Sequence, residues 1–268
     1  MCSPFDARPP ELPAALRLPP LAGGAPAETI ELTSADGTAF SAAVALPTET
    51  RDEDEAPPTG VVILPDVRGL YPFYSELAER FALAGHPAIV IDYFGRTAGL
   101  GPRGEDFDFW PHVEQTTVEQ VQADVAAAEQ ELKQRAGVER LVTVGFCFGG
   151  LHSLLVGTSD ELQSEAVVAF YGGLDGTRFG IEGPLQRAEA IHKPVLGLYG
   201  DADQGIPVEQ LEEFDARLTG PREIVIYPGA PHSFFDRSFA EHQQTCEDAW
   251  FRVLAFVDGA GATVVPDS

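Results

Sequence analysis

Short apolar runs alternate with amphipathic stretches along most of the chain. The run Gly60–Pro65 is continuously apolar, as expected for a strand buried on both faces of a sheet. The same pattern predicts strands at Ala88–Tyr93, Leu141–Gly145, Ala166–Phe170, Val195–Tyr199 and Glu223–Tyr227. Helical periodicity predicts helices at Tyr74–Ala84, Glu114–Arg135, Leu151–Val156, Val208–Leu218 and Phe239–Val257. Strands that alternate with helices predict an α/β fold, with a mostly parallel twisted sheet and helices on both faces.

Two alternating stretches precede this region and predict a β-hairpin. Apolar and polar residues alternate in Thr29–Ser34 and again in Thr38–Ala45. That pattern is typical of two antiparallel strands with one buried face, joined by a tight turn. Residues 1–27 are rich in proline and lack periodicity, so we expect an arm packed on the domain. Residues 28–268 show no repeat or linker and are expected to form a single domain.

Composition and charge narrow the range of functions. The 268 residues include 42 acidic and only 17 basic side chains, a formal net charge of -25. Such a surface repels phosphate backbones and anionic membranes, so we expect no nucleic-acid or membrane partner. No apolar run is long enough for a membrane span, and the N-terminus lacks the features of a secretory signal, so we expect a cytoplasmic protein. Nothing in the sequence indicates the oligomeric state.

Cysteine use and motifs indicate chemistry without a cofactor. The three cysteines, Cys2, Cys147 and Cys246, are too few for a disulfide framework. The sequence contains neither a cluster typical of a metal site nor a glycine-rich loop that binds phosphate. We therefore expect no metal and no other cofactor, and side chains alone to perform the chemistry.

The sequence Gly145-Phe146-Cys147-Phe148-Gly149-Gly150 follows a predicted strand and opens a helical pattern. This spacing is typical of a nucleophile elbow, a sharp turn from strand to helix, here with cysteine in place of the usual serine. Glycines remove side chains that would clash in the turn, and the helix N-terminus favours a thiolate. A cysteine between two phenylalanines is often only a small buried hydrophobe. The flanking glycines favour a catalytic Cys147 instead.

Two later loops supply the partners that a cysteine nucleophile needs. Asp201 and Asp203 follow a predicted strand, and Asp203 is the predicted triad acid because it lies shortly before the Ile-Pro start of the next helix. Asp201 is the alternative, and its other expected role is to cap the loop. His232 follows the last predicted strand in a loop bounded by glycine and proline, and is the predicted general base. The order nucleophile, acid, histidine is that of the α/β-hydrolases.

These motifs resemble those of the dienelactone hydrolase family. The resemblance is carried by Gly145–Gly150, by Tyr199–Asp203 with an Ile-Pro pair after it, and by Gly229–Phe234, and it extends from about Val61 to Val257. It implies an α/β-hydrolase fold and a cysteine hydrolase that acts on small activated esters or lactones. The reaction typical of the family opens dienelactone to maleylacetate. The implied partner of this chain is therefore a small-molecule ester or lactone.

The same resemblance implies roles for residues near the elbow. Asp66 takes the position of a family carboxylate, typically glutamate, that keeps the cysteine neutral at rest and helps to activate it when substrate binds. The backbone N–H groups of Val67 and Phe148 are implied as the oxyanion hole, in which each donor is worth about 3 kcal/mol at the transition state. The thiol chemistry is thus expected to depend on the loop after the strand at Gly60–Pro65.

Substrate-binding residues are implied by the resemblance at two places. Arg96 matches one of two family arginines that bind a substrate carboxylate, and Tyr93 precedes it in the same loop. The second arginine position, four residues after His232, is occupied by Asp236, with Arg237 next to it. A carboxylate at that position repels an anionic substrate, which argues against dienelactone itself.

The predicted mechanism is acyl transfer in two steps. His232, oriented by Asp203, takes the thiol proton while Cys147 attacks the carbonyl, and water then hydrolyses the thioester. The aromatic stretch Phe107–Trp110 is interpreted as part of the pocket, with Trp110 contacting substrate, although an ordinary packed loop explains it equally well. Two other functions stay open. They are acyl transfer to an acceptor other than water, and a catalytically silent hydrolase fold that binds ligands or senses thiol oxidation.

Overall fold

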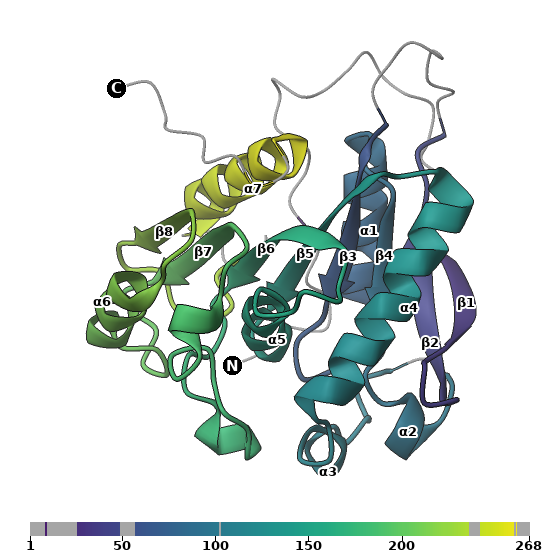
Figure 1. Cartoon of the computed structure of the whole chain (residues 1–268), viewed down its shortest axis with the longest axis horizontal. Coiled ribbons are helices and arrows are strands. Elements are labelled where there is room, and N and C mark those ends of the chain that lie inside the picture. The colour runs from purple at the N-terminus through teal and green to yellow at the C-terminus, as the bar shows by residue number, and fades with distance from the viewer. Residues whose placement is uncertain are drawn as a thin grey trace.

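The computed structural model describes residues 9, 26–48, 57–101, 103–235, 242–259 and 261. Its strands are β1 (Glu28–Thr33), β2 (Ala39–Ala45), β3 (Thr59–Leu64), β4 (Ala88–Ile91), β5 (Arg140–Phe146), β6 (Ser164–Phe170), β7 (Val195–Gly200) and β8 (Arg222–Tyr227). They form one sheet in the order β1-β2-β4-β3-β5-β6-β7-β8 (Figure 1). Strands β3 to β8 run parallel, whereas β1 pairs antiparallel with β2, and β2 with β4. The predicted hairpin and the mostly parallel sheet are confirmed.

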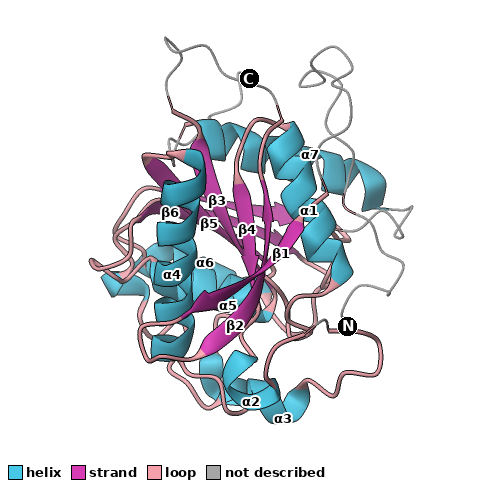
Figure 2. Ribbon diagram, turned by 90° about the vertical axis from the view of Figure 1, so that its right-hand side faces the viewer, coloured by secondary structure: helices cyan, strands magenta, loops and turns pink. Residues whose placement is uncertain are grey.

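Helices cover both faces of this sheet. They are α1 (Pro72–Leu83), α2 (Gly95–Ala98), α3 (Trp110–Val113), α4 (Val118–Ala136), α5 (Phe148–Val156), α6 (Val208–Arg217) and α7 (Gln243–Asp258), with two 3₁₀ turns, η2 (Gly176–Phe179) and η3 (Ala188–Ala190). Figure 2 shows α1 and α7 on one face of the sheet and α4 on the other. Helix α4 packs beside α5, so the helix that follows the elbow lies on the α4 face.

Helix α4 begins at Val118 rather than at the predicted Glu114. Thr117 caps it, because its side-chain oxygen accepts a hydrogen bond from the Gln120 N–H at 3.3 Å while the Gln120 side chain accepts one from the Thr117 N–H at 3.0 Å. This capping box satisfies two N–H groups that a helix start leaves unpaired. Gly137 ends the helix in the left-handed conformation, with φ 61°. Residues 114–116 lie between this cap and the separate helix α3, which is too short to produce a periodic pattern.

An aromatic cluster fills the core below the carboxyl ends of the central strands. Phe146, at the end of β5, stacks on Phe170 at the end of β6, with ring centroids 4.6 Å apart. Phe235 contacts these rings at centroid distances of 5.8 and 4.4 Å. All three side chains are fully buried. Because Phe146 precedes Cys147 and Phe235 lies shortly after His232, the core fixes both loops that carry these residues.

Several predictions concern residues outside the described part of the chain. These are the N-terminal arm, of which only positions 9, 26 and 27 are described, the start of the last helix at Phe239, and the positions of Asp236 and Arg237. None of the helices that the structure describes is long and apolar enough to cross a membrane.

Candidate active site

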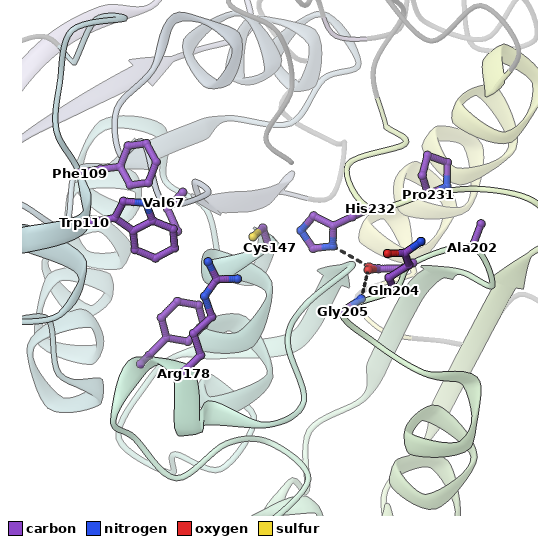
Figure 3. A pocket seen from close by; sticks show the side chains of 12 residues that line it. Val67, Phe109, Trp110, Cys147, Arg178, Ala202, Gln204, Gly205, Pro231 and His232 are labelled. Atoms are coloured by element: carbon purple, nitrogen blue, oxygen red, sulfur yellow. Dashed lines mark hydrogen bonds and ion pairs between the residues drawn. The ribbon is translucent and has the colours of Figure 1, made fainter.

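Loops at the carboxyl ends of four parallel strands carry the predicted catalytic residues. Asp66 follows β3, Cys147 follows β5, Asp203 follows β7 and His232 follows β8. The carboxyl ends of parallel strands open on the same edge of a sheet, where ligands of α/β proteins bind. Cys147, Asp203 and His232 surround one pocket at this edge (Figure 3). The fold therefore brings together three residues that lie far apart in the sequence.

Cys147 lies on a strained turn between β5 and α5. Its backbone has φ 53° and ψ -109°, in a region that residues with a side chain rarely adopt. A Cβ at position 145 would lie 2.0 Å from the Gly149 carbonyl oxygen, and one at position 149 would lie 2.1 Å from the Leu64 carbonyl oxygen. Both contacts are with backbone atoms, so glycine is required at these two positions. The spacing of the motif thus follows from the geometry of the turn.

Asp203, rather than Asp201, faces the histidine. The Oδ2 atom of Asp203 lies 2.6 Å from Nδ1 of His232, and its Oδ1 atom accepts a hydrogen bond from the Gly205 N–H at 2.9 Å. Asp203 is only 6% exposed. Asp201 is exposed and accepts a hydrogen bond from the Gly229 N–H. This geometry fits Asp203 as the acid partner and Asp201 as a loop cap.

The His232 imidazole is held between the acid and an aromatic ring. Its centroid lies 5.0 Å from that of Tyr171, a buried residue at the end of β6. Because Asp203 binds Nδ1, the Nε2 atom is the ring nitrogen left for the nucleophile. Figure 3 shows this nitrogen turned toward Cys147. Such a fixed imidazole is oriented for proton transfer to and from a thiol.

Two backbone N–H groups near Cys147 have no acceptor among the described residues, namely those of Val67 and Phe148. Phe148 is the first residue of α5, where backbone N–H groups have no partner within the helix. Val67 lines the pocket together with Cys147. These are the two positions that the family resemblance implied for an oxyanion hole.

The Asp66 carboxylate is directed to an arginine in its own loop. It accepts hydrogen bonds from the Arg68 side chain at 2.7, 3.0 and 3.1 Å and from the Arg68 N–H at 2.9 Å. The Arg68 guanidinium also lies over the Tyr71 ring, 4.0 Å from its centroid. The Asp66 carboxylate thus forms an ion pair within its own loop.

Arg96 is not among the residues that line the pocket. Its guanidinium binds the Asp124 carboxylate at 2.7 and 2.9 Å, the Asp36 carboxylate at 2.8 Å and the Ser34 hydroxyl at 2.9 Å. Although burial opposes its charge, hydrogen bonds to Asp124 and Asp36 raise the pKa of Arg96 above its usual value. Asp124 belongs to α4, whereas Ser34 and Asp36 belong to the hairpin turn. Arg96 therefore joins the hairpin to α4.

Tyr93 is also withdrawn from the pocket surface. It is 2% exposed, and its hydroxyl donates a hydrogen bond to the Pro65 carbonyl oxygen at 2.7 Å. Burial, with the nearby charge of Asp66, raises the pKa of Tyr93 well above its usual value, so the hydroxyl stays protonated. Tyr93 does not line the pocket. The structure places Tyr93 behind the residues that line the pocket, with its hydroxyl directed to the Pro65 carbonyl oxygen.

The pocket beside Cys147 has a volume of about 650 Å³. An aromatic wall formed by Phe109, Trp110 and Phe179 bounds it, so the structure places Trp110 in the pocket. No three His, Cys, Asp or Glu side chains among the described residues are grouped as metal ligands would be. The reactive side chains that line the pocket, Cys147, Asp203 and His232, suit nucleophilic attack and proton transfer.

Arg178 is a pocket residue that the sequence patterns did not reveal. It belongs to η2, in a segment between β6 and β7 that has neither strand nor helical periodicity. Its guanidinium lies over the Trp110 ring, 4.7 Å from the centroid. No carboxylate in the described part of the chain forms an ion pair with it. A cation that has no acidic partner among the described residues is notable in a chain whose net charge is -25.

The parallel sheet, the elbow after β5 and the acid–histidine pair after β7 and β8 define an α/β-hydrolase. A puromycin-hydrolyzing peptidase from Mycobacterium tuberculosis shares this fold, with a TM-score of 0.68 and 21% identity over 90% of this chain and 41% of that one. The sequence is more specific, because the profile of the dienelactone hydrolase family matches residues 40–260. The chain belongs to the dienelactone hydrolase family.

Individual relatives agree with this assignment. A carboxymethylenebutenolidase from Rhodococcus opacus is 32% identical over 213 residues, which is 74% of this chain and 80% of the relative. The crystal structure of a "putative dienelactone hydrolase" from Klebsiella pneumoniae has a TM-score of 0.74 and 29% identity, and the match covers 86% of this chain and 98% of that one. The resemblance inferred from three motifs is confirmed, and the protein is a hydrolase of the lactone and ester class.

Proposed function

We propose that this protein hydrolyses small activated esters or lactones through a triad of Cys147, His232 and Asp203, with an acyl-enzyme thioester as intermediate. The observation that carries the proposal is the 2.6 Å contact between His232 Nδ1 and Asp203 Oδ2, in a pocket that also contains the strained Cys147. A merely structural cysteine needs neither a positive φ nor an acid–histidine pair beside it. Membership of the dienelactone hydrolase family supports the same reaction class.

The first step transfers the acyl group to sulfur. The thiol proton of Cys147 passes to Nε2 of His232 while the sulfur forms a bond to the carbonyl carbon. Asp203 keeps the imidazole in position and stabilises the charge that it gains. The tetrahedral intermediate then breaks its C–O bond to the leaving group, and His232 returns the proton to the departing oxygen.

The second step releases the acid. Water gives a proton to Nε2 of His232, and its oxygen attacks the thioester carbonyl. The C–S bond breaks, the carboxylic acid leaves, and the sulfur regains its proton. Because a thiolate departs more easily than an amine, the intermediate formed from an amide returns to substrate. Esters and lactones with a good leaving oxygen are therefore the favoured substrates.

The negative oxygen of the tetrahedral intermediate is assigned to the N–H groups of Val67 and Phe148. Both groups are without an acceptor among the described residues, which supports this assignment. The N-terminal end of α5 adds a favourable dipole at the same place. A backbone donor of this kind contributes about 3 kcal/mol at the transition state.

Arg178 supports a substrate that carries a negative group away from the reacting carbonyl. It lines the same pocket as Cys147, and stacking on Trp110 restricts its guanidinium. A planar guanidinium forms paired hydrogen bonds to a carboxylate. The proposed substrate is thus an anionic ester or lactone, with its charge held by Arg178 rather than by Arg96.

The proposal is tested with p-nitrophenyl acetate and a panel of small lactones, with and without iodoacetamide. We expect turnover by the reduced protein, loss of turnover after alkylation, and no detectable turnover by Cys147→Ala. Acid quenching during turnover should trap an acetyl group on the peptide that contains Cys147. Full activity in Cys147→Ala would overturn the thiol mechanism, because the reaction would then proceed without the proposed nucleophile.

A further inference from the structure

Tyr93 contacts both of the loops that carry the proposed oxyanion-hole donors. Its hydroxyl donates to the Pro65 carbonyl oxygen at 2.7 Å, in the loop that continues to Val67. Its ring meets the Phe148 ring edge-on, with centroids 5.4 Å apart and planes at 90°. Phe148 is the first residue of α5, so its N–H is the donor on the elbow side. One buried side chain thus links the two halves of the hole.

The Pro65 carbonyl is confined on its other side by the elbow itself. A Cβ at position 149 would lie 2.3 Å from the Pro65 oxygen, so the backbone of the elbow helix runs directly against this peptide. The Pro65 oxygen therefore lies between the Gly149 backbone and the Tyr93 hydroxyl. A shift of this peptide would also move Val67, because the two residues belong to the same short loop.

Tyr93 is well suited to hold another group and poorly suited to bind substrate. It is 2% exposed, it does not line the pocket, and it lies two residues after the end of β4 in the core of the fold. Its ring also contacts Phe94 at a centroid distance of 5.8 Å. Burial and neighbouring carboxylates keep its hydroxyl in the donor form, as its raised pKa shows.

We propose that Tyr93 is a positioning residue, whose hydroxyl holds the Pro65 peptide against the elbow so that the N–H groups of Val67 and Phe148 point to one oxygen. The inference rests on the proposed thiol hydrolase function. Loss of the hydroxyl leaves a buried carbonyl without its donor and allows the loop to relax. Because a misplacement of about 1 Å costs on the order of 100-fold in rate, we expect kcat to fall about 10-fold to 100-fold.

The test is Tyr93→Phe, which keeps the ring and removes the hydroxyl. Two rates are measured on the same protein, ester turnover with p-nitrophenyl acetate and alkylation of Cys147 by iodoacetamide. Alkylation displaces iodide from a saturated carbon and forms no oxyanion, so it reports the reactivity of the thiol alone. We expect kcat to fall as stated above. KM and the alkylation rate should stay within about twofold of wild type, because these two quantities do not depend on the oxyanion donors.

Tyr227→Phe is the matched control. The Tyr227 hydroxyl donates to Asp248 on α7 at 2.8 Å, so this variant also removes a partly buried tyrosine hydrogen bond, but on a different element. We expect both rates to remain at the wild-type level. Peptide mapping after alkylation checks the fold of each variant, because Cys246 is 1% exposed and should remain unlabelled in the folded protein.

Three outcomes would contradict the proposal, and they are distinguishable. Unchanged ester turnover in Tyr93→Phe would show that the hydroxyl does not position the hole. Equal losses in turnover and alkylation would show that Tyr93 acts on the thiol rather than on the oxyanion. A wild-type protein that is alkylated at Cys147 yet turns over no ester would overturn the proposed function itself, and the role of Tyr93 with it.

Discussion

Two regions border the pocket and are built differently. The catalytic edge consists of the elbow and the loops after β3, β7 and β8. The outer wall consists of residues 107–113 and η2. At the edge, backbones are in contact: a Cβ at position 200 would lie 2.0 Å from the Ala230 carbonyl oxygen. On the wall, the contact is between two exposed side chains, Arg178 and Trp110, 4.7 Å apart. The edge therefore permits one backbone arrangement, whereas side chains on the wall can be exchanged more easily. We expect the edge to determine the reaction and the wall to determine the substrate.

The largest effect is expected at the edge. Asp203→Asn should lower kcat/KM by about 10⁴, because an asparagine favours the wrong imidazole tautomer. Asp201→Asn is the matched control, since Asp201 is exposed and binds only the Gly229 N–H among the described residues. It should stay within a few-fold of wild type. Steady-state kinetics on one ester measure kcat/KM for both variants. A large loss in Asp201→Asn with little change in Asp203→Asn would show that Asp201 is the acid.

A smaller and more selective effect is expected on the wall. Arg178→Gln should raise KM for p-nitrophenyl hemisuccinate about 10-fold to 100-fold, as expected for the loss of a hydrogen bond to a charged group. The neutral p-nitrophenyl butyrate should be unaffected, and Arg178→Lys should keep part of the preference. An equal change for both esters would show that Arg178 supports the fold of the wall and does not bind an anion.

Arg96→Gln sharpens the same contrast. Arg96 pairs with Asp124, whose side chain is 1% exposed, so the substitution leaves a buried carboxylate without its partner. We expect the free energy of unfolding to fall by about 3 kcal/mol, as measured by urea denaturation. The ratio of KM for p-nitrophenyl hemisuccinate to KM for p-nitrophenyl butyrate should stay at its wild-type value. A selective loss of affinity for the anionic ester would show that Arg96 binds the negative group of the substrate.

An effect that depends on pH, and is absent at neutral pH, concerns a histidine on the helix after the elbow. His152 on α5 is fully buried, and burial lowers its pKa from 6.5 to about 3. The folded protein therefore keeps it neutral at pH values where the unfolded chain binds a proton. Below pH 6.5 this residue should destabilise the fold by about 1.4 kcal/mol per pH unit until pH approaches 3. Urea denaturation of wild type and His152→Leu between pH 6.5 and 4.5 measures the difference, and parallel curves would contradict it.

The edge was predictable from the sequence because its geometry restricts the residues that fit. Glycine at 145 and 149, a cysteine between them, and an acid and a histidine after two later strands are local patterns in a fixed order. The strands of the sheet were predictable for a related reason, since burial on both faces requires continuous apolar runs. Among the predicted helices, the bounds shifted, as in α4, where a capping box decided the start.

The wall and the arginines were not predictable because their positions depend on residues distant in the chain. Arg96 follows β4 as expected, but its direction is determined by Asp124 and Asp36, far away in sequence. Arg178 reaches the pocket only because η2 meets the segment that carries Trp110. Asp66 differs from both, since its partner Arg68 lies only two residues away, yet the sequence analysis did not predict this pair.

The strand order has a consequence for how this protein is made. Strands β5, β6, β7 and β8 are neighbours in the sheet in the same order as in the chain. A ribosome that has released the chain through β6 has therefore exposed the elbow, but neither the acid nor the base that serves it. Until the loop after β8 has emerged from the ribosome, the Cys147 thiol is without its proposed acid and base partners. A chain synthesised only through β6 is therefore expected to contain the proposed nucleophile and to lack hydrolase activity.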